Sequence, residues 1–327
     1  MDDELAKLTD KKQRLDALQP LPPELIKNLD EWYRIELTYT SNAIEGNTLT
    51  RAETALVVEK GITVQGKTLI EHLEAKNHAA AVDFIKELAA HTAPADITQN
   101  TILDIHRHIL KGIDDANAGG YRSVPVRVQG SQTVFPNYMR VPDLMAAFVT
   151  ELHEVAKTEH PVIVAAFAHF RLVSIHPFVD GNGRTARLLM NLILEQNGYP
   201  PAIIQKEERL QYINALEQSR ITENPNLFYG VVVEAEERSL DIYLDEDKTP
   251  VTAEQRLLRI GDIARLASEE VPTIRFWTDQ GLLQLADRSS SGYRLYEPEA
   301  VEQAKRIREL QQQRLTLGEI KEKLDGK

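Results

Sequence analysis

Apolar residues recur at helical spacing along most of the chain. After the proline-rich residues 20–23, apolar side chains three and four positions apart predict a first long helix over about residues 24–46, which Gly46 and Asn47 end. The same spacing predicts further helices, in order, over residues 51–60, 69–90, 98–111, 142–157, 160–174, 183–197, 206–220 and 225–243. The body of the protein is therefore expected to be mainly α-helical.

Residues 120–141 break this pattern. Valine alternates there with polar residues, β-branched side chains are frequent, and Gly130 with Ser131 has the composition of a turn. The stretch predicts a short, exposed β-hairpin.

The C-terminal part has the pattern of a separate unit. Residues 245–250 are charged, lack periodicity and end in proline, which is typical of a linker. We therefore expect, in order, an N-terminal extension (1–22), a helical body (23–245), a linker (246–257) and a C-terminal unit (258–327). The elements expected in that unit are two short helices with helix-turn-helix spacing near 260–267 and 272–279, a wing over 281–296, and helices near 298–313 and 316–324.

Composition and charge exclude several classes of protein. The 327 residues are 42% hydrophobic and 27% charged, as in soluble globular proteins, and the absence of cysteine excludes disulfides, thiolate zinc sites and a cysteine nucleophile. No export signal and no apolar run of about 18 residues is found, so we expect a cytoplasmic protein without membrane contact. The net charge of −12 argues against general nucleic-acid binding, but residues 256–327 hold 13 basic and 12 acidic side chains and are nearly neutral.

The strongest chemical signal is the segment 174–187, Ser-Ile-His-Pro-Phe-Val-Asp-Gly-Asn-Gly-Arg-Thr-Ala-Arg. A glycine-rich turn that leads into a helix presents unpaired N–H groups at the positive end of the helix dipole, which suits a phosphate group. Arg184 and Arg187 can add charge-assisted bonds to phosphate oxygens, and Asp180 is a hard oxygen ligand suited to Mg²⁺. His176 can take a proton from an attacking hydroxyl. Each feature alone is more often structural, and it is their combination that indicates phosphate chemistry.

Residues 176–187 match the signature of the Fic family, His-x-Phe-x-Asp/Glu-Gly-Asn-Gly-Arg-x-x-Arg, at every fixed position, and residues 24–245 resemble that family in helix order. The resemblance implies a mainly helical Fic fold with a small β-hairpin flap. It also implies transfer of AMP from ATP, with Mg²⁺, to a Ser, Thr or Tyr hydroxyl of a target protein or of the chain itself, with release of diphosphate. The roles that it implies are His176 as general base, Asp180 as Mg²⁺ ligand, Gly181, Asn182, Gly183 and Arg184 as the cradle for the α- and β-phosphates, and Arg187 as the γ-phosphate ligand.

Two further parts of the body resemble features of this family. The predicted hairpin resembles the flap that docks a target segment by strand pairing, here through Val126, Val128 and Phe135. Tyr212 lies in a region that in relatives is near the adenine, although it can equally be a core residue. Phosphotransferase relatives replace the Asp-Gly-Asn-Gly segment that this chain keeps, which favours nucleotidyl transfer.

The end of the first long helix, Thr-Ser-Asn-Ala-Ile-Glu-Gly-Asn over residues 40–47, carries a possible brake. Ser41 and Glu45 are four residues apart and lie on one face of a helix that ends at Gly46, as in an ordinary helix terminus. The stretch also resembles the Fic inhibitory motif Ser/Thr-x-x-x-Glu-Gly/Asn. That resemblance implies that Glu45 pairs with Arg187 and occupies the γ-phosphate site, or that Glu45 positions a water that removes AMP from a modified target.

The C-terminal unit resembles the winged helix-turn-helix domain of the MerR family at residues 273–277, Thr-Ile-Arg-Phe-Trp, and 292–294, Gly-Tyr-Arg. The resemblance implies that Arg275, Tyr293 and Arg294 contact DNA phosphates. Acidic residues in the turn at 269–270 and the low net charge are unfavourable for DNA, so a protein-docking role stays open. The expected partners are thus ATP, a target protein, and DNA or a docking protein, with a homo-oligomer possible since a palindromic DNA site needs a two-fold symmetric dimer. The alternative for the whole chain is a DNA-binding regulator whose Fic body senses nucleotide.

Overall fold

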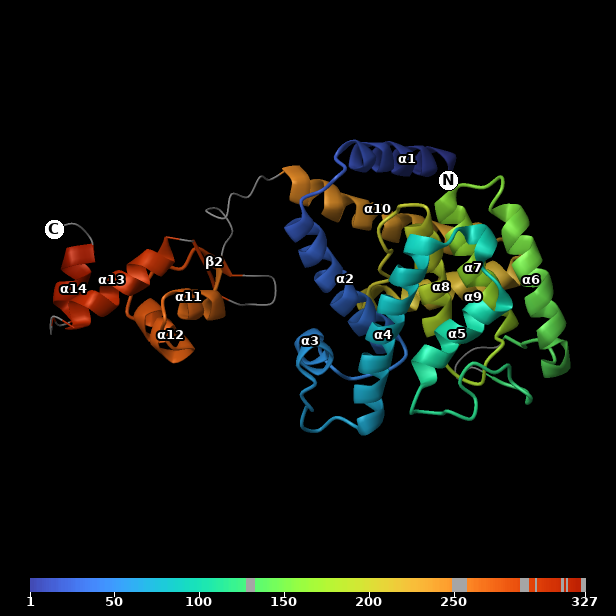
Figure 1. Ribbon diagram of the computed structural model, residues 1–327, viewed down its shortest axis with the longest axis horizontal. Coiled ribbons are helices and arrows are strands. Elements are labelled where there is room, and N and C mark those ends of the chain that lie inside the picture. Colours follow the sequence, from blue (N-terminus) through green and yellow to red (C-terminus); the bar gives the residue numbers. More distant parts are fainter. Residues whose placement is uncertain are drawn as a thin grey trace. The chain divides into compact units, whose positions relative to one another are not determined.

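The computed structural model describes residues 1–127, 133–248, 258–288, 294–297, 299–312, 315 and 317–324. These residues are mainly helical, which confirms the predicted fold class, and the chain divides into two compact units, Met1–Asp245 and Glu246–Lys327 (Figure 1). Each unit has its own buried apolar core.

The α-helices predicted for the first unit are present, with small shifts at their ends. They are α2 (Pro23–Ile44), α3 (Arg51–Lys60), α4 (Leu69–His91), α5 (Gln99–Leu110), α6 (Val141–Val155), α7 (Pro161–Ile175), α8 (Asn182–Gln196), α9 (Arg209–Ile221) and α10 (Asn226–Lys248). Short 3₁₀ helices occur at η1 (Pro94–Asp96), η2 (Tyr138–Arg140) and η3 (Lys206–Glu208). The last helix continues into the segment expected as linker, of which residues 249–257 lie outside the described part of the chain.

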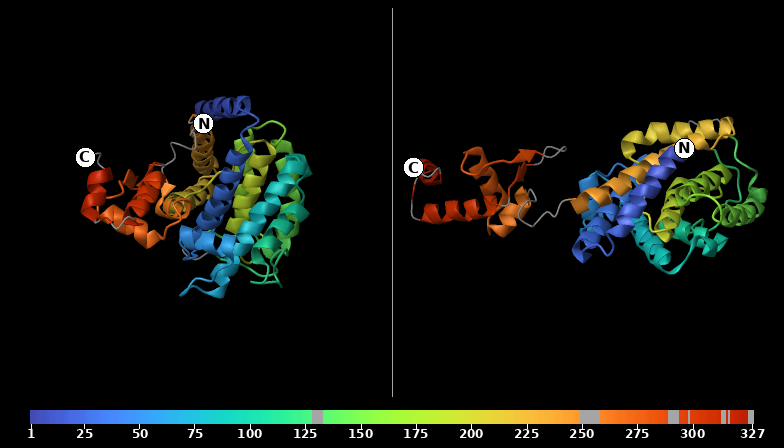
Figure 2. Two further views of the ribbon diagram at one scale, coloured as in Figure 1. Left: turned by 60° about the vertical axis from the view of Figure 1, so that its left-hand side comes forward. Right: turned by 90° about the horizontal axis from the view of Figure 1, so that it is seen from above.

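Helix α8 forms the centre of the first unit. Nearly all of its side chains from Asn182 to Leu194 are buried, since the helix packs against α4, α5 and α7 (Figure 2). Helix α2 lies along α4 and reaches α8 near its own C-terminal end. This arrangement brings the end of α2, which carries Ser41 and Glu45, next to the start of α8, which carries the motif.

Local sequence signals explain where α3 and α4 begin. Thr50 accepts a hydrogen bond from the backbone of Glu53, whose carboxylate accepts one in return, and Thr68 and Glu71 repeat the arrangement at α4. Such capping boxes satisfy N–H groups that the first helical turn leaves unpaired. Helix α3 ends at Gly61, whose φ of 64° is a left-handed conformation that glycine adopts without strain.

An additional helix, α1 (Asp2–Ala17), occupies the segment expected only as an extension. Leu8 and Leu15 are buried in the core, and the ammonium of Lys11 pairs with Glu237 and Asp241 of α10 at 2.8 and 2.7 Å. The apolar positions in this helix are few among charged residues, so their spacing alone gives a weak signal.

The hairpin predicted over residues 120–141 is wrong for the residues described, which form no strand there. The turn at Gly130 and Ser131 lies outside them. Instead of a strand ladder, the buried Arg122 side chain connects the segments before and after residues 128–132. It donates to the carbonyls of Val124 (3.1 Å) and Pro136 (2.6 Å). Its Nε also donates to the carbonyl of His176 (2.8 Å). Side-chain bonds to the backbone thus replace the strand pairing that the alternation of valines suggested.

The second unit has a small sheet and four helices in its described residues. Its elements are β1 (Leu258–Arg259), α11 (Ile260–Leu266), α12 (Val271–Asp279), β2 (Asp287–Arg288), β3 (Arg294–Tyr296), α13 (Ala300–Gln312) and α14 (Leu317–Leu324). The strands are antiparallel in the order β1-β3-β2, with Leu258 opposite Tyr296 and Arg288 opposite Arg294. Trp277 and Tyr296 are fully buried between the helices and the sheet. Helices α11 and α12 have the helix-turn-helix order that the sequence predicts.

Across the described residues, no helix has both the length and the apolar character needed to cross a bilayer.

One buried carboxyl group leads to a stability prediction. Glu236 on α10 is 0% exposed, and neither of its carboxylate oxygens has a hydrogen-bond partner within the described structure. Burial raises the pKa of Glu236 well above its usual value, so the folded protein keeps this group protonated. Its contribution to stability is fully present below the unfolded pKa of about 4.3, and falls by about 1.4 kcal/mol per pH unit as pH rises toward the folded pKa.

We therefore expect Glu236→Gln to be more stable than the wild type by roughly 1–3 kcal/mol at pH 8, and nearly equal to it at pH 4. Urea unfolding of both proteins at the two pH values measures this difference. An equal difference at both pH values would show that Glu236 does not titrate between them.

Candidate active site

The turn between α7 and α8 holds the segment expected to carry the chemistry. His176 follows α7 in the left-handed conformation (φ 52°), and its N–H donates to the carbonyl of Leu172. Asn182, the first residue of α8, closes the turn: its side-chain oxygen accepts from the N–H of Phe178 (2.9 Å) and its amide donates to the Phe178 carbonyl (3.0 Å). The asparagine side chain is therefore used within the turn that it shapes.

His106 on α5 supports this turn, although no sequence pattern marks it. Its ring stacks on Phe178 with 3.7 Å between the ring centroids. Its Nδ1 accepts from the N–H of Gly119 (3.0 Å), so Nε2 carries the proton and donates to the carbonyl of Asp180 (3.0 Å). Burial lowers the pKa of His106 to about 4, which keeps the ring neutral in this tautomer at neutral pH. A Cβ at Gly181 (φ 76°) would lie 3.3 Å from this ring, so the position favours glycine.

His176 is held as a neutral imidazole. Burial, together with the charges of Arg220 and Arg122, lowers the pKa of His176 to about 4. Its Nδ1 lies 3.3 Å from the carbonyl of Val173, which places the proton on Nδ1 and leaves a lone pair on Nε2. The imidazole is thus in the form that a general base requires.

The described flap residues lie beside this histidine. The ring of Phe135 stacks on the His176 ring with 4.1 Å between centroids, and Val126 is half-buried. Val128 lies outside the described residues. Phe135 thereby covers one face of His176, while docking of a target by these residues stays a prediction.

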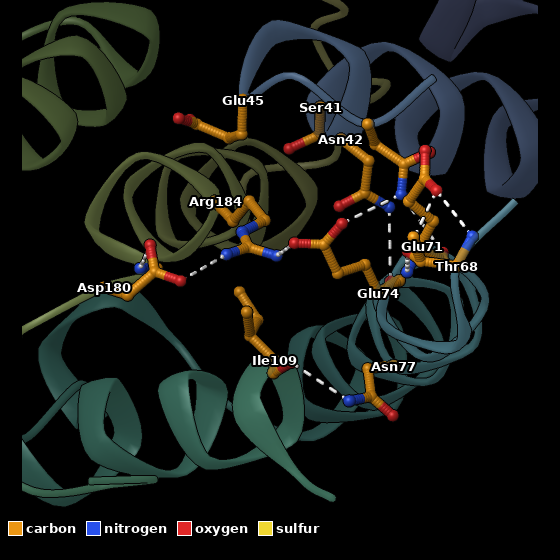
Figure 3. A network of polar contacts seen from close by, with 12 residues as sticks. Ser41, Asn42, Glu45, Thr68, Glu71, Glu74, Asn77, Ile109, Asp180 and Arg184 are labelled. Atoms are coloured by element: carbon orange, nitrogen blue, oxygen red, sulfur yellow. Dashed lines mark hydrogen bonds and ion pairs between the residues drawn. The ribbon is translucent and has the colours of Figure 1, made fainter. Parts of the chain in front are cut away.

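Arg184 lies between two carboxylates, as Figure 3 shows. Its Nη1 donates to Glu74 of α4 at 2.8 Å, and its Nη2 donates to Asp180 at 3.1 Å. Glu74 also accepts from the amide of Asn47 (2.9 Å), and its carbonyl accepts from the amide of Asn42 (3.2 Å). Glu74 is a site residue that the sequence did not reveal, and it ties the start of α8 to the end of α2.

Arg187 is bound to the end of α2. It is 5% exposed, and its Nη2 donates to Glu45 (2.7 Å) and to the carbonyl of Ser41 (2.9 Å). Its Nε donates to the hydroxyl of Ser41 at 2.9 Å. The structure thus brings together the three residues Ser41, Glu45 and Arg187 that the sequence associates.

The absence of a side chain at Gly183 makes room for this pair. A Cβ at Gly183 would lie 2.2 Å from Oε1 of Glu45 and 3.1 Å from Nη1 of Arg187. The Glu45 carboxylate therefore rests against the first turn of α8, where backbone N–H groups at the positive helix end favour an anion.

Tyr212 on α9 is buried, with 2% exposed. Its hydroxyl accepts from Nη1 of Arg187 (3.3 Å) and lies 3.0 Å from Nε2 of His169. These contacts place Tyr212 in the core behind Arg187, and contact with a base stays a prediction.

The residues present fit a Mg²⁺ ion bound through one carboxylate. Asp180 has a 66% exposed side chain, of which Oδ2 accepts from Arg184 and Oδ1 from the N–H of Gly181 (2.6 Å). No group of three or more His, Cys, Asp or Glu suited to a metal occurs among the residues described. Mg²⁺ commonly takes one or two protein carboxylates and completes its shell with phosphate and water, so Asp180 alone is a sufficient protein ligand.

In the second unit, Arg275 is exposed on α12. Arg294 donates to Asp279 (2.7 Å) and to the carbonyl of Arg275 (3.4 Å), and Tyr293 lies outside the described residues. Glu269 pairs with Arg308, whose guanidinium lies 5.5 Å from the centroid of the Trp277 ring. The carboxylate in the turn is therefore neutralised by a structural ion pair.

Two family models match the chain. The model of the Fic/DOC family matches residues 96–194, and the model of the MerR HTH family regulatory protein matches residues 258–327.

Related proteins and structures agree with the first match. Protein adenylyltransferase Fic of Drosophila grimshawi is 37% identical over 241 residues, which cover 73% of this chain and 49% of that protein, and the Drosophila melanogaster protein is 38% identical over 73% and 48%. The chain thus spans about half the length of these curated relatives. A Fic domain containing signaling protein from Bacteroides thetaiotaomicron superposes with a TM-score of 0.67 at 30% identity, over 75% of this chain and 98% of the other. Fic-1 from C. elegans (residues 134–508) has a TM-score of 0.67 at 32% identity, over 76% and 72%.

Proposed function

The chain belongs to the Fic/DOC family, and from this premise we propose that it is a protein adenylyltransferase, which transfers AMP from ATP to a hydroxyl group of a protein. The observation that carries the proposal is the neutral His176 beside an anion-binding turn that retains both arginines. The activity of the curated relatives supports the same reaction.

In the proposed reaction His176 acts as the base. The hydroxyl oxygen of the target forms a bond to the α-phosphorus of ATP, and its proton moves to Nε2 of His176. The bond from the α-phosphorus to the oxygen that bridges to the β-phosphorus breaks, and diphosphate leaves. The first turn of α8 and Arg184 hold the phosphates in line with the hydroxyl, which is the main task of a protein in such transfers. Mg²⁺ at Asp180 would supply neutralisation of phosphate charge.

The position of the label in ATP tests this reaction. We expect radioactivity to enter protein from ATP labelled at the α-phosphate and not from ATP labelled at the γ-phosphate, because only AMP is transferred. Incorporation from the γ-label alone would identify a kinase instead and would contradict the proposal.

We further propose that Glu45 is an inhibitory residue. Its carboxylate holds Arg187 at 2.7 Å and lies over Gly183, so ATP cannot place its γ-phosphate on Arg187 until this pair opens. An α-phosphate bound without that contact would be misaligned with the attacking hydroxyl, and small misplacements are costly in rate.

Glu45 also favours a second candidate reaction, the removal of AMP. Its side chain is 38% exposed at the edge of the site and can hold a water molecule there. The water oxygen would form a bond to the phosphorus of a modified protein while one of its protons passes to the Glu45 carboxylate. The bond from the phosphorus to the protein oxygen would break, the protein oxygen would take up a proton to become a hydroxyl, and AMP would leave. Release of AMP from a modified protein, lost in Glu45→Gly, tests this reaction.

For the second unit we propose DNA binding through α12. Arg275 is exposed on that helix, and the Glu269–Arg308 pair removes one of the negative charges that would repel phosphate.

We expect the unit's affinity for duplex DNA to fall steeply with salt, and Arg275→Ala to weaken binding and reduce the slope of log affinity against log salt by about 1. Lys305→Ala on α13, where the lysine pairs with Glu302, is the matched control and should leave the slope unchanged. If the affinity of the full chain for DNA does not depend on salt, the protein-docking role is favoured instead.

A further inference from the structure

A cavity of about 200 Å³ lies at the far end of α8, about 20 Å along the helix from the motif turn. Residues of α1, α2, α4, α8 and α10 and of the loop after α8 line it. Leu15, Leu37, Val82 and Pro200 supply apolar wall. A concave, largely apolar space with a few polar groups is the common form of a small-molecule site.

Aromatic rings form another part of the wall. Tyr33 of α2 and Tyr243 of α10 are stacked, with 5.7 Å between centroids and 28° between planes, and both line the cavity. Tyr199 also lines it, and the Lys12 ammonium lies 5.5 Å from the centroid of the Tyr199 ring, so the rings open to a ligand are those of Tyr33 and Tyr243. The faces of aromatic rings attract cations, most strongly where water is excluded.

The two basic residues of the cavity already have acidic partners. Arg34 donates to both carboxylate oxygens of Asp83, at 2.7 and 2.8 Å, and Lys86 pairs with Asp30. An anionic ligand would have to displace one of these carboxylates.

Glu195, in contrast, has an unused carboxylate. It lines the cavity from the last turn of α8, and no hydrogen bond or ion pair involves its side chain in the described structure. Burial raises its pKa to about 7, against the lowering effect of the nearby Lys86 ammonium, which itself pairs with Asp30. The side chain is half-buried, so its carboxylate faces the cavity and is free to accept hydrogen bonds from a ligand.

We propose that this cavity is a binding site for a small primary ammonium compound, whose N–H groups bond to Glu195 and whose apolar stem packs among the tyrosine rings. A quaternary ammonium would make the cation–π contact with the tyrosine rings but has no N–H to donate to the Glu195 carboxylate. An alcohol of the same shape would donate one neutral hydrogen bond and would lack the charge that both features favour.

Calorimetric titration of the full chain at pH 8 with isopentylamine and with isopentyl alcohol tests the site. At this pH the Glu195 carboxylate is ionised and the amine is protonated. We expect the amine to bind at least tenfold more tightly than the alcohol. Glu195→Gln should remove this preference, while Glu87→Gln, an exposed acidic residue of α4 outside the cavity, should retain it.

Tyr243→Leu provides an independent check. Removal of the ring should weaken binding of the amine more than binding of the alcohol, while the Glu195 carboxylate stays unchanged. Circular dichroism of each variant establishes that it is folded. Equal affinity for amine and alcohol, no binding of the amine, or an unchanged preference in folded Glu195→Gln would each overturn the proposal.

Discussion

Replacement of Glu45 by glycine is expected to increase the transfer of α-phosphate label to protein by roughly 100-fold. The carboxylate holds the buried guanidinium of Arg187, and breaking a fully buried pair of this kind costs about 3–5 kcal/mol. Because the Glu45 side chain is 38% exposed, solvent weakens the pair, and we expect the lower end, about 3 kcal/mol, or two powers of ten in rate. The rate of label incorporation at saturating ATP measures the effect.

Two further variants separate charge from helix damage. Glu45→Gln keeps the size of the side chain and removes its charge, so we expect an increase between those of the wild type and Glu45→Gly. Glu59→Gly makes the same substitution at an exposed position near the end of α3 and should leave the rate unchanged. If folded Glu45→Gly binds ATP and transfers no more label than the wild type, Glu45 is not the inhibitory residue.

The contacts around Glu45 show how far the sequence could predict this site. The spacing of Ser41 and Glu45 placed both on one face at the end of a helix, and the motif placed Arg187 at the start of another. Local patterns define such positions, because a helix repeats every 3.6 residues. They do not show that Gly183 leaves the space in which the Glu45 carboxylate lies, since that is a property of two packed helices.

The residues that the sequence did not reveal act across long distances in the chain. Glu74 meets Arg184 from 110 residues away, and His106 meets Asp180 from 74 residues away. A lone glutamate or histidine on an amphipathic helix is ordinary, so only the packing of α4 and α5 on α8 distinguishes them. The hairpin prediction failed for a related reason. The hydrogen bonds from the Arg122 side chain to backbone carbonyls depend on the folded chain, and the alternation of apolar and polar residues does not indicate them.

Replacement of His176 by alanine in the Glu45→Gly protein is expected to reduce label transfer by 10²- to 10⁴-fold, the usual contribution of a general base. The lone pair on Nε2 is lost, while Arg184 and Arg187 keep their positions because their hydrogen bonds to Glu74, Asp180, Ser41 and Glu45 do not involve His176. Since the pKa of His176 is lowered to about 4, the base is unprotonated at neutral pH, and its contribution should fall only as pH drops through about 4. Single-turnover transfer rates measure the loss.

Nucleotide binding distinguishes a missing base from a damaged site. The Glu45→Gly/His176→Ala protein should bind ATP as tightly as Glu45→Gly, and His91→Ala, at an exposed histidine at the end of α4, should change neither binding nor rate. Transfer that persists at the Glu45→Gly rate would assign the base to another group. A chain that only senses nucleotide would need the phosphate cradle and not the base, so undiminished ATP binding with abolished transfer favours an enzyme over a sensor.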